Sequence, residues 1–267
     1  MIELGDQEFA RFQSFIYEAA GISLSNSKKV LVSGRLEKRL RHHRLNSYGD
    51  YLQLISQPGQ AAERQVAIDQ LTTNETYFFR EPRHFELLRE WAGAARDAGR
   101  GLRVWSAACS SGEEAYSIAM VLADCLGESR PWEVVASDIS SRVLQRARFG
   151  HYPVERTTHI PLAYLQRFCL RGTGPQAGTL LVQRSLRQRV QFTQINLDQT
   201  LPPQAHFDLI FLRNVMIYFS NDTKRRVVSR LVGQLKPGGH LLIGHSETLN
   251  DVSSQVRPVM PSVYRKP

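Results

Sequence analysis

Leu102-Arg-Val-Trp-Ser-Ala-Ala-Cys-Ser-Ser-Gly112-Glu113-Glu114 is a short apolar strand followed by a loop of small residues and the first turn of a helix. Small side chains let a ligand approach the loop backbone, and Gly112 permits a tight turn. The loop does not match the G-x-G-x-x-G pattern, so a pyrophosphate-binding cradle is poorly supported. The segment therefore predicts a different ligand at the end of this strand, where sheets of this kind bind their ligands.

Strands and helices alternate on the C-terminal side of this segment. Apolar strands are expected at residues 102–106, 132–138, 207–212 and 240–244, and helices at 113–126, 140–149 and 222–235. Alternation of this kind places helices on both faces of a parallel sheet. The sequence predicts a Rossmann-like, doubly wound α/β domain.

The chain is expected to have three parts. Residues 1–70 carry apolar side chains at helical spacing and predict an all-α domain, residues 71–95 are a linking segment, and residues 96–267 form the α/β domain. Turn residues between positions 171 and 178 interrupt the α/β rhythm. We therefore expect residues 163–193 to form a small antiparallel β insertion, with strands at 179–182 and 189–192.

The composition is that of an ordinary globular protein, with 42% hydrophobic and 22% charged residues. No apolar run approaches the ~20 residues that cross a bilayer, and the acidic N-terminus does not resemble a secretory signal, so a cytoplasmic location is expected. The three cysteines include no close pair, and the eight histidines lie outside the usual zinc spacings. Neither a disulfide framework nor a bound metal is predicted.

Most of the positive charge is local. The net charge is +9, and residues 28–44 contain seven Lys or Arg residues and one Glu, a net charge of +6. Arg35, Lys38, Arg39 and His42 gather on one side of the predicted helix, beside its apolar stripe. Such a face either binds an acidic partner or is a solvated helix surface.

Two acids mark the predicted ligand site. Glu113 follows the small-residue loop and fits S-adenosylmethionine, which carries an ammonium and a sulfonium, better than a dinucleotide. The alternative is an acidic first turn that interacts with the helix dipole. Asp138 ends the second strand, 26 residues after Gly112, close to the position from which an acid accepts hydrogen bonds from ribose hydroxyls. It also suits the cap of the following helix.

Four further patterns are spread along the chain. They are Thr72-Thr-Asn-Glu-Thr-Tyr-Phe-Phe-Arg80, Trp105-Ser-Ala-Ala-Cys-Ser-Ser-Gly-Glu-Glu-Ala-Tyr-Ser117, Arg213-Asn-Val-Met-Ile-Tyr-Phe219 and Gly244-His-Ser-Glu247. In this order and spacing they resemble the CheR family, the chemotaxis receptor glutamate methyltransferases. The resemblance covers nearly the whole chain and includes the basic helical region and the insertion.

The resemblance implies a site for S-adenosylmethionine, with S-adenosylhomocysteine as product and no metal. Carried over by motif, the residues that line this site are Asn74, Thr76, Arg80, Glu113, Asp138, Asn196, Leu197, Arg213 and Asn214. The linking segment 71–95 would then contribute to the active site. Without the resemblance, Asn196 reads as a turn residue and residues 72–76 as a capping segment.

The implied reaction is a direct transfer of the methyl group to a glutamate γ-carboxylate. A surface glutamate has a pKa of about 4.3 and is already ionised at neutral pH, so no general base is required. We expect Arg80 and Tyr218 to orient this carboxylate, Arg80 through charge-assisted hydrogen bonds and Tyr218 through its hydroxyl. The alternative for Arg80 is a surface ion pair with Glu81 or Glu86.

The implied partners are methyl-accepting chemotaxis receptors. Their methylation helices are acidic, so the face formed by Arg35, Lys38, Arg39 and His42 would recognise them by charge complementarity. The insertion, around Arg171, Gly172 and Gly174, resembles family members that bind the C-terminal tail peptide of the receptor, a mode available to an edge strand. We expect a monomer, because no spare amphipathic surface is evident.

Two other functions compete with this interpretation. A nucleic-acid methyltransferase that acts on base amines usually ends a strand with a [DNS]-P-P-[YF] pattern, but Asn214-Val-Met-Ile lacks the prolines. A pyrimidine 5-methyltransferase needs a catalytic cysteine, and Cys109 lies in the cofactor loop, where packing is expected. The second rival is a non-catalytic protein that binds S-adenosylmethionine, and the intact substrate positions argue against it.

Overall fold

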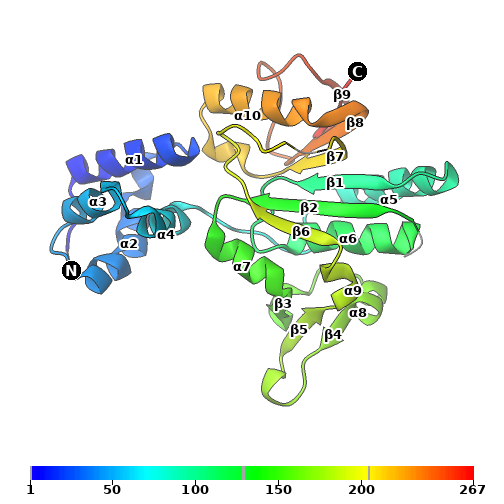
Figure 1. The fold of residues 1–267 in the computed structure, drawn as a ribbon, viewed down its shortest axis with the longest axis horizontal. Helices are drawn as coiled ribbons and strands as arrows, with labels where there is room; N and C mark the ends of the chain where they lie inside the picture. The colour runs from blue at the N-terminus through cyan, green and yellow to red at the C-terminus, as the bar shows by residue number, and fades with distance from the viewer. Residues whose placement is uncertain (1, 128–129, 204) are drawn as a thin grey trace.

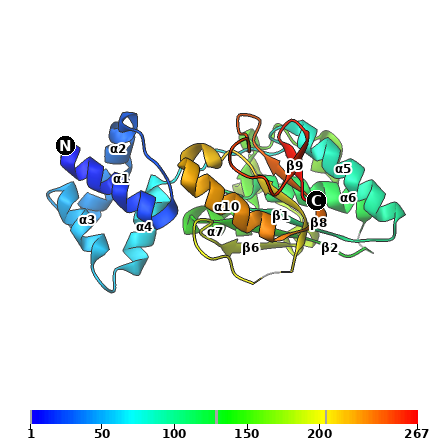
Figure 2. The same cartoon turned by 90° about the horizontal axis from the view of Figure 1, so that it is seen from above.

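The computed structural model describes residues 2–127, 130–203 and 205–267, so Met1 of the expected helical domain lies outside the described residues. Helices α1–α4 form one group beside the central sheet, and the extended segment after α4 connects the two (Figures 1 and 2). The helices are α1 (Asp6–Ala20), α2 (Lys29–His43), α3 (Tyr48–Ser56) and α4 (Ala61–Leu71). The expected all-α N-terminal region is confirmed.

The helical domain has a core of its own. Its fully buried side chains include Phe12, Ile16, Val32, Leu36 and Leu40, which lie on the apolar stripes that the helical spacing predicts. Gly21 caps the C-terminus of α1 and has a φ of 67°, the left-handed conformation that glycine reaches without steric cost.

The central sheet has seven strands in the order β6-β2-β1-β7-β8-β10-β9. Its strands are β1 (Leu102–Ser106), β2 (Trp132–Asp138), β6 (Val190–Gln194), β7 (Phe207–Leu212), β8 (Leu235–Ile243), β9 (Arg257–Met260) and β10 (Val263–Arg265). Strands β6, β2, β1, β7 and β8 run parallel, and β10 is antiparallel to both β8 and β9. The strand order reverses between β1 and β7, so the ligand crevice is expected at their carboxyl ends. The predicted doubly wound α/β fold is confirmed.

Helices cover both faces of this sheet (Figure 1). They are α5 (Pro82–Asp97), α6 (Glu113–Leu126), α7 (Ser141–Phe149) and α10 (Asn221–Gly233). Alternate strand residues enter two separate cores: Val104 packs in the core that includes α5 and α6, and Trp105 in the core that includes α10. Because side chains within the strands alternate between the two cores, functional side chains are expected at the strand ends.

The insertion differs from the expectation at both of its borders. Its antiparallel sheet has the order β3-β5-β4, with β3 (His151–Pro153), β4 (Cys169–Arg171) and β5 (Thr179–Val182). The sheet therefore begins before residue 163. The strand expected at 189–192 is β6, which pairs in parallel with β2 in the large sheet, Val134 opposite Val190. The local β pattern is the same in both settings, and only the tertiary pairing assigns the strand to its sheet.

Within the described part of the chain, no helix combines the length and the apolar character that crossing a membrane requires.

Candidate functional site

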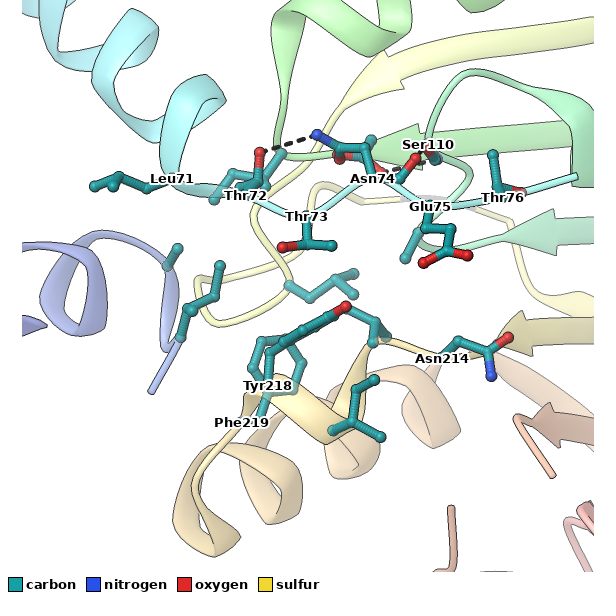
Figure 3. Close-up of a pocket in the computed structure, with 18 of the residues that line it drawn as sticks. Leu71, Thr72, Thr73, Asn74, Glu75, Thr76, Ser110, Asn214, Tyr218 and Phe219 are labelled. Carbon is teal, nitrogen blue, oxygen red and sulfur yellow. Dashed lines mark hydrogen bonds between the residues drawn. The ribbon is translucent and has the colours of Figure 1, made fainter. Parts of the chain in front are cut away.

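A cavity of about 310 Å³ lies where the helical domain, the segment after α4 and the carboxyl ends of β1, β2 and β7 meet (Figure 3). The sequence-predicted residues in its lining are Asn74, Thr76, Arg80, Asp138, Asn196, Leu197, Arg213, Asn214 and Tyr218. These positions are up to 144 residues apart in the chain. The fold therefore brings eight of the nine predicted cofactor residues and both predicted catalytic residues to one cavity.

Asp138 ends β2 at the inner side of the cavity and is 8% exposed. Its carboxylate accepts hydrogen bonds from the backbone N–H of Ser110 at 2.9 Å and of Ser140 at 2.9 Å. Burial raises the pKa of Asp138 to about 6, although these N–H groups favour the charged form. A carboxylate held in this way is suited to accept hydrogen bonds from hydroxyl groups of a ligand.

The segment of residues 72–76 crosses the cavity in extended form, opposite the Tyr218 side chain (Figure 3). Asn74 fastens it, because the Asn74 amide donates to Thr72 Oγ1 at 3.2 Å and the Asn74 carbonyl accepts from Ser110 Oγ at 3.0 Å. The Thr76 carbonyl accepts from Arg156 at 3.1 Å. This region is therefore a fixed strap over the cavity, and the capping segment that sequence alone suggests is wrong, because the following helix α5 has Glu81 at its N-cap.

Arg213 follows β7, and its side chain is 1% exposed. It forms ion pairs with Glu81 at 3.0 Å and with Glu114 at 2.8 Å, and it donates to the carbonyl of Arg80. These contacts join the ends of α5, α6 and β7. Because the guanidinium is used in this way, Arg213 shapes the cavity mainly by fixing its neighbours.

Glu81, one of the two partners of Arg213, also binds neighbouring groups of the site. It has a φ of 57° and precedes α5, and its carboxylate accepts from the Asn214 amide at 3.3 Å and from the His245 N–H at 3.1 Å. Burial alone would raise the pKa of Glu81, but the positive charge of Arg213 and these hydrogen bonds lower it below the ordinary value.

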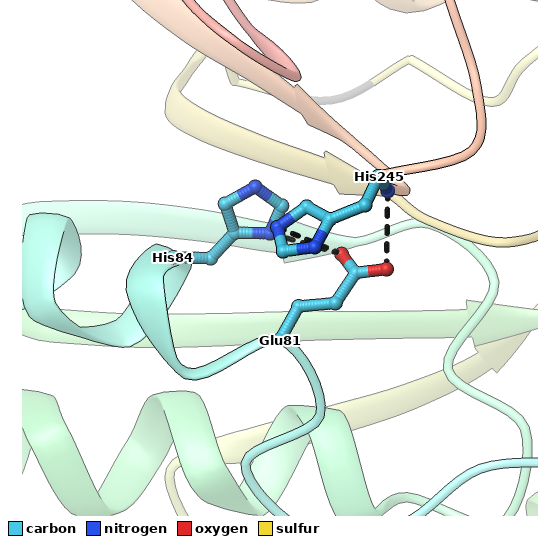
Figure 4. A group of neighbouring side chains, drawn as sticks. All are labelled: Glu81, His84 and His245. Carbon is cyan, nitrogen blue, oxygen red and sulfur yellow. Dashed lines mark hydrogen bonds and ion pairs between the residues drawn. The ribbon is translucent and has the colours of Figure 1, made fainter.

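Glu81, His84 and His245 form the group of possible metal ligands found among the described residues, with ligand atoms within 4.8 Å of one another (Figure 4). The same Glu81 oxygen that faces His84 at 3.4 Å already pairs with Arg213 at 3.0 Å. Burial lowers the pKa of His84 to about 3, so His84 is neutral at physiological pH. The cation that Glu81 holds is therefore the Arg213 guanidinium, and it would oppose a second cation at this place.

Arg80 is half-buried at the cavity wall, where it donates to the Glu75 carbonyl at 3.2 Å and lies 5.7 Å from the ring centroid of Tyr77. The alternative that Arg80 forms a surface pair is wrong, because Glu81 pairs with Arg213 and Glu86 pairs with Arg83 at 2.7 Å. Arg80 thus retains guanidinium donors that a ligand carboxylate can use.

The structure corrects the prediction for Glu113. This side chain is 0% exposed, pairs with Arg156 at 2.6 Å and accepts from Ser111 Oγ at 2.7 Å, and it is not part of the cavity lining. Burial raises the pKa of Glu113, although Arg156 opposes the shift. One residue further, a rotation of about 100° brings Glu114 into the lining instead.

Asn196 is both a cavity residue and a turn residue. Its side-chain oxygen accepts from the Asp198 N–H at 3.0 Å, as expected for an Asn in a turn. Its amide donates to the carbonyl of Ala19 in the helical domain at 2.7 Å. Asn196 therefore ties the end of β6 to α1, and Leu197 follows it in the lining.

Sequence reasoning missed several residues of the site, because Ile22, Ser23, Leu24 and Glu75 also line the cavity. Ala107, Ala108 and Ser110 line it as well, and they belong to the small-residue loop that was expected to approach a ligand. Glu247 is near the site without lining it: its carboxylate accepts from the N–H groups of Asn214 at 3.0 Å, Ile217 at 3.3 Å and Gly244 at 2.7 Å. This carboxylate fixes the loop that carries Tyr218. The Gly244-His-Ser-Glu247 pattern in the sequence could have identified Glu247 as a residue near the site.

Two of the four residues of the predicted basic recognition face are bound inside the helical domain, and the other two are exposed. Arg35 donates to the carbonyls of Gln70, Leu71 and Thr72 at 3.3, 3.5 and 3.0 Å, and Arg39 pairs with the buried Glu63 at 2.5 Å. Both arginines thus serve the internal structure of the helical domain, contrary to the expectation of a free surface. Lys38 and His42 are exposed. Lys28 and Arg44, directly before and after α2, are also exposed, and the exposed Arg41 pairs with Glu37 at 2.7 Å.

In the insertion, Arg171 is exposed at the end of β4, and two glycines shape the loop that follows. A Cβ atom on Gly172 would lie 1.9 Å from the carbonyl oxygen of Gln176, and Gly174 has a φ of 55°. The glycines therefore determine the backbone path and offer no side chain for recognition.

Comparison with known proteins gives a consistent result. A family model described as the all-alpha domain of CheR methyltransferase matches residues 7–72, and one described as the SAM binding domain of CheR methyltransferase matches residues 74–264. The chain is 46% identical over 261 residues to "Chemotaxis protein methyltransferase 2" of Pseudomonas aeruginosa. The aligned region covers 97% of this chain and 92% of that protein. It is 45% identical over 267 residues to "Chemotaxis protein methyltransferase" of Escherichia coli, with 98% and 92% covered.

Replacing Arg213 by Met should destabilise the protein by about 3–5 kcal/mol, because Glu81 and Glu114 would keep buried, unpaired charges. Thermal unfolding at pH 7.5 measures this loss. The pKa of Glu81 is lowered in the folded state, so its pair contributes stability above the pKa of about 4.3 for an unfolded glutamate and loses it as pH falls below that value. The gap between variant and wild type should narrow in acid, and a gap that is small and independent of pH would contradict this account.

Proposed function

The chain belongs to the CheR methyltransferase family, and we propose that it transfers the methyl group of S-adenosylmethionine to γ-carboxylates of specific glutamates on chemotaxis receptors. The products would be glutamate methyl esters and S-adenosylhomocysteine. The observation that supports this most directly is one cavity with a buried hydroxyl acceptor, Asp138, on its inner side and two carboxylate-orienting groups, Arg80 and Tyr218, in its lining.

The residues of the cavity fit S-adenosylmethionine. Small side chains at Ala107, Ala108 and Ser110 leave room beside β1, and the lining carries the acids Glu75, Glu114 and Asp138, of which Glu114 is already paired with Arg213. When bound, S-adenosylmethionine supplies an electrophilic methyl group on a sulfonium sulfur. Acids in the lining favour a ligand that carries both an ammonium and a sulfonium charge.

The positions of the cavity residues support a role for each in binding the cofactor. Asp138 would accept hydrogen bonds from ribose hydroxyls, and Asn196 and Leu197 would flank the adenine at the end of β6. Asn74 and Thr76 hold the strap over the cofactor, and Asn214 lies at the opposite wall (Figure 3). Glu114 replaces Glu113 in this set, and Arg213 acts through the two carboxylates it pairs with.

The chemical step requires alignment more than acid–base catalysis. A substrate glutamate is already ionised at neutral pH, so the enzyme does not need to remove a proton. Arg80 would orient the carboxylate by charge-assisted hydrogen bonds and Tyr218 by its hydroxyl, which points into the cavity in Figure 3. Positioning of this kind can contribute up to about 7–11 kcal/mol.

Ester formation tests the proposed function. The protein is incubated with S-adenosylmethionine carrying a labelled methyl group and with receptor cytoplasmic fragments from the same bacterium. We expect label on the receptor that mild base releases as methanol, which is typical of a carboxyl ester. Cofactor binding without release of methanol would instead identify a non-catalytic binding protein, and label that resists base would reject glutamate as the acceptor.

Arg80→Ala should lower turnover on the order of a hundredfold while changing the affinity for S-adenosylhomocysteine much less, because its main contact is expected with the substrate carboxylate. Tyr218→Phe should lower turnover with little change in cofactor affinity. Calorimetry and single-turnover kinetics measure the two quantities. Equal losses of binding and turnover in Arg80→Ala would assign Arg80 to the cofactor alone, and full turnover in Tyr218→Phe would remove the hydroxyl from the mechanism.

Cofactor affinity should depend on pH through Asp138. Burial raises its pKa to about 6, so the ionised carboxylate costs stability in the free protein as pH rises through that value. A ligand whose hydroxyl groups donate hydrogen bonds to Asp138 favours the ionised form of this carboxylate. The affinity for S-adenosylhomocysteine should therefore rise from pH 5 to pH 7 and then level off. Asp138→Asn should bind weakly at every pH, and a variant with the wild-type pH profile would reject this role.

We infer that receptor methylation helices dock on the part of the predicted basic face of α2 that is exposed, Lys38 and His42, with Lys28 and Arg44 exposed directly before and after the helix. Lys38→Glu together with His42→Glu should slow receptor methylation at low salt, and the effect should shrink as salt screens the charges. Arg257→Glu, a charge reversal at an exposed position on β9, is the control for Lys38→Glu, which is also measured alone. Equal rates for the double variant and the control would reject docking at this face.

We also propose that the β3-β5-β4 sheet binds the C-terminal tail peptide of the receptor. Strands β3 and β4 are its two edges, and Leu170 on β4 is 52% exposed, so an extended peptide can add to this edge. Leu170→Asp should weaken binding of a synthetic tail peptide by about tenfold, the cost expected for a lost apolar contact. Leu162→Asp, at a leucine that is 69% exposed on α8 (Leu162–Phe168), should not. Absence of saturable binding by wild type would contradict the proposal.

The cellular setting follows from this function. The proposed substrates are the cytoplasmic helices of membrane receptors, so the protein would act in the cytoplasm and be recruited to receptor arrays. We propose a monomer that neither inserts in the membrane nor acts on nucleic acid. The positive charge is used in part inside the helical domain by Arg35 and Arg39, and this lessens the case for a nucleic-acid partner.

A further inference from the structure

Helix α7 receives its N-terminal cap from the other domain. Ser140 occupies the N-cap position, but its side chain makes no capping hydrogen bond, and its buried hydroxyl has no partner among the described residues. The carboxylate of Asp69 on α4 accepts instead from the Ser141 N–H at 3.0 Å, the Ser141 hydroxyl at 2.7 Å and the Arg142 N–H at 3.2 Å. A carboxylate at this end is also favoured by the helix dipole.

The capped turn is part of the cavity wall. Asp138 and Ile139, which line the cavity, directly precede Ser140 and Ser141, and Asp138 accepts from the Ser140 N–H at 2.9 Å. A second contact across the boundary acts on the same turn, because the Gln65 amide donates both to Asp69 at 2.8 Å and to the Ile139 carbonyl at 3.0 Å. The helical domain therefore holds the turn that carries Asp138.

Asp69 is itself firmly held. It is 4% exposed, and its backbone carbonyl accepts from the Arg142 guanidinium at 3.0 Å and from Thr72 Oγ1 at 3.2 Å. Arg35 binds the next three carbonyls at the end of α4. Yet Asp69 does not line the cavity. An effect of Asp69 on the cavity must therefore pass through the turn that it caps.

We propose that Asp69 is a positioning residue for the cofactor: by capping α7 across the domain boundary it fixes the turn 138–141, so that cofactor affinity depends on the docked helical domain. The inference rests on the proposed cofactor site. It gives the helical domain a role in cofactor binding through a residue that does not reach the cavity. Asp69 is expected to affect affinity and to leave the cavity lining intact.

The experiment compares Asp69→Asn with wild type in the full-length protein, with S-adenosylhomocysteine titrated by calorimetry from pH 5 to pH 8. Asn keeps the size of the side chain but loses its charge and one acceptor. We expect about tenfold weaker binding at pH 7.5, the upper range of a lost helix cap. Asp50→Asn, the same change at an exposed position of the helical domain, should bind as wild type. Asp69→Glu, which keeps the charge, should recover part of the affinity.

The pH midpoint tests whether the Asp69 carboxylate lies beside Asp138, as the cap on α7 requires, and Asp69→Glu, which keeps the charge, should retain the wild-type midpoint. Asp69 is a negative charge that helps to raise the pKa of Asp138, and Asp138 in turn helps to raise the pKa of the buried Cys109 thiol. The cation Arg142 is bound to the backbone carbonyl of Asp69 at 3.0 Å. Removing the Asp69 charge should move the midpoint of the binding profile to lower pH. A merely destabilised protein would bind less at every pH with an unchanged midpoint.

Hydrogen exchange gives a second reading. The amides of Ser141 and Arg142 should exchange faster in Asp69→Asn than in wild type, while amides in β1 and α6 keep their rates. If Asp69→Asn binds with wild-type affinity and midpoint, the positioning role is overturned. If wild type itself does not bind S-adenosylhomocysteine, the proposed function fails first, and the two failures are therefore distinguishable.

Discussion

The site depends on one buried cation. Arg213 at the end of β7 joins Glu81, which precedes α5, to Glu114 in the first turn of α6, with a side chain that is 1% exposed. A buried charge is tolerated only when it is paired, so the guanidinium and the two carboxylates have to occupy one arrangement. That arrangement brings three separate segments of the chain to the carboxyl ends of β1 and β7. Removal of the guanidinium would leave two acids to repel one another, and the wall that carries Arg80 and Asn214 would lose its anchor.

The second constraint is that neither domain forms the cavity alone. Residues 20–31 and the strap 72–76 close it from the side of the helical domain, and Asp138, Asn196 and Tyr218 belong to the α/β domain. Direct hydrogen bonds cross the boundary at Asn196 with Ala19 and at Asp69 with Ser141. A cofactor bound in this cavity would therefore favour the docked arrangement of the domains. This arrangement also places the start of α2 next to the cavity, since Leu31 and Lys28, which directly precedes the helix, are part of the lining.

The differences between expectation and structure have a common physical origin. Glu113 and Glu114 are adjacent acids, and only the direction in which α6 leaves the loop decides which one faces the cavity and which one pairs with Arg156. Arg35 and Arg39 have the composition of a recognition face, but a carbonyl cluster and a buried glutamate lie within their reach. Strand β6 has the same pattern as a strand of the insertion. In each case the deciding partner lies 20 or more residues away in the sequence.

Local pattern and residue type were sufficient for the alternation of strands and helices, the all-α N-terminal region, the ligand site at the strand ends and Asp138 within it, because periodicity and strand-end position are properties of short segments. Most of the other predicted cofactor residues came from the resemblance. The resemblance to a known family supplied the chemistry. Tertiary structure alone decided which charges are used internally, which sheet receives β6, and that Asp69 caps a helix of the other domain. Those outcomes depend on side chains from distant segments competing for the same buried hydrogen-bond donors and acceptors, and no local pattern records that competition.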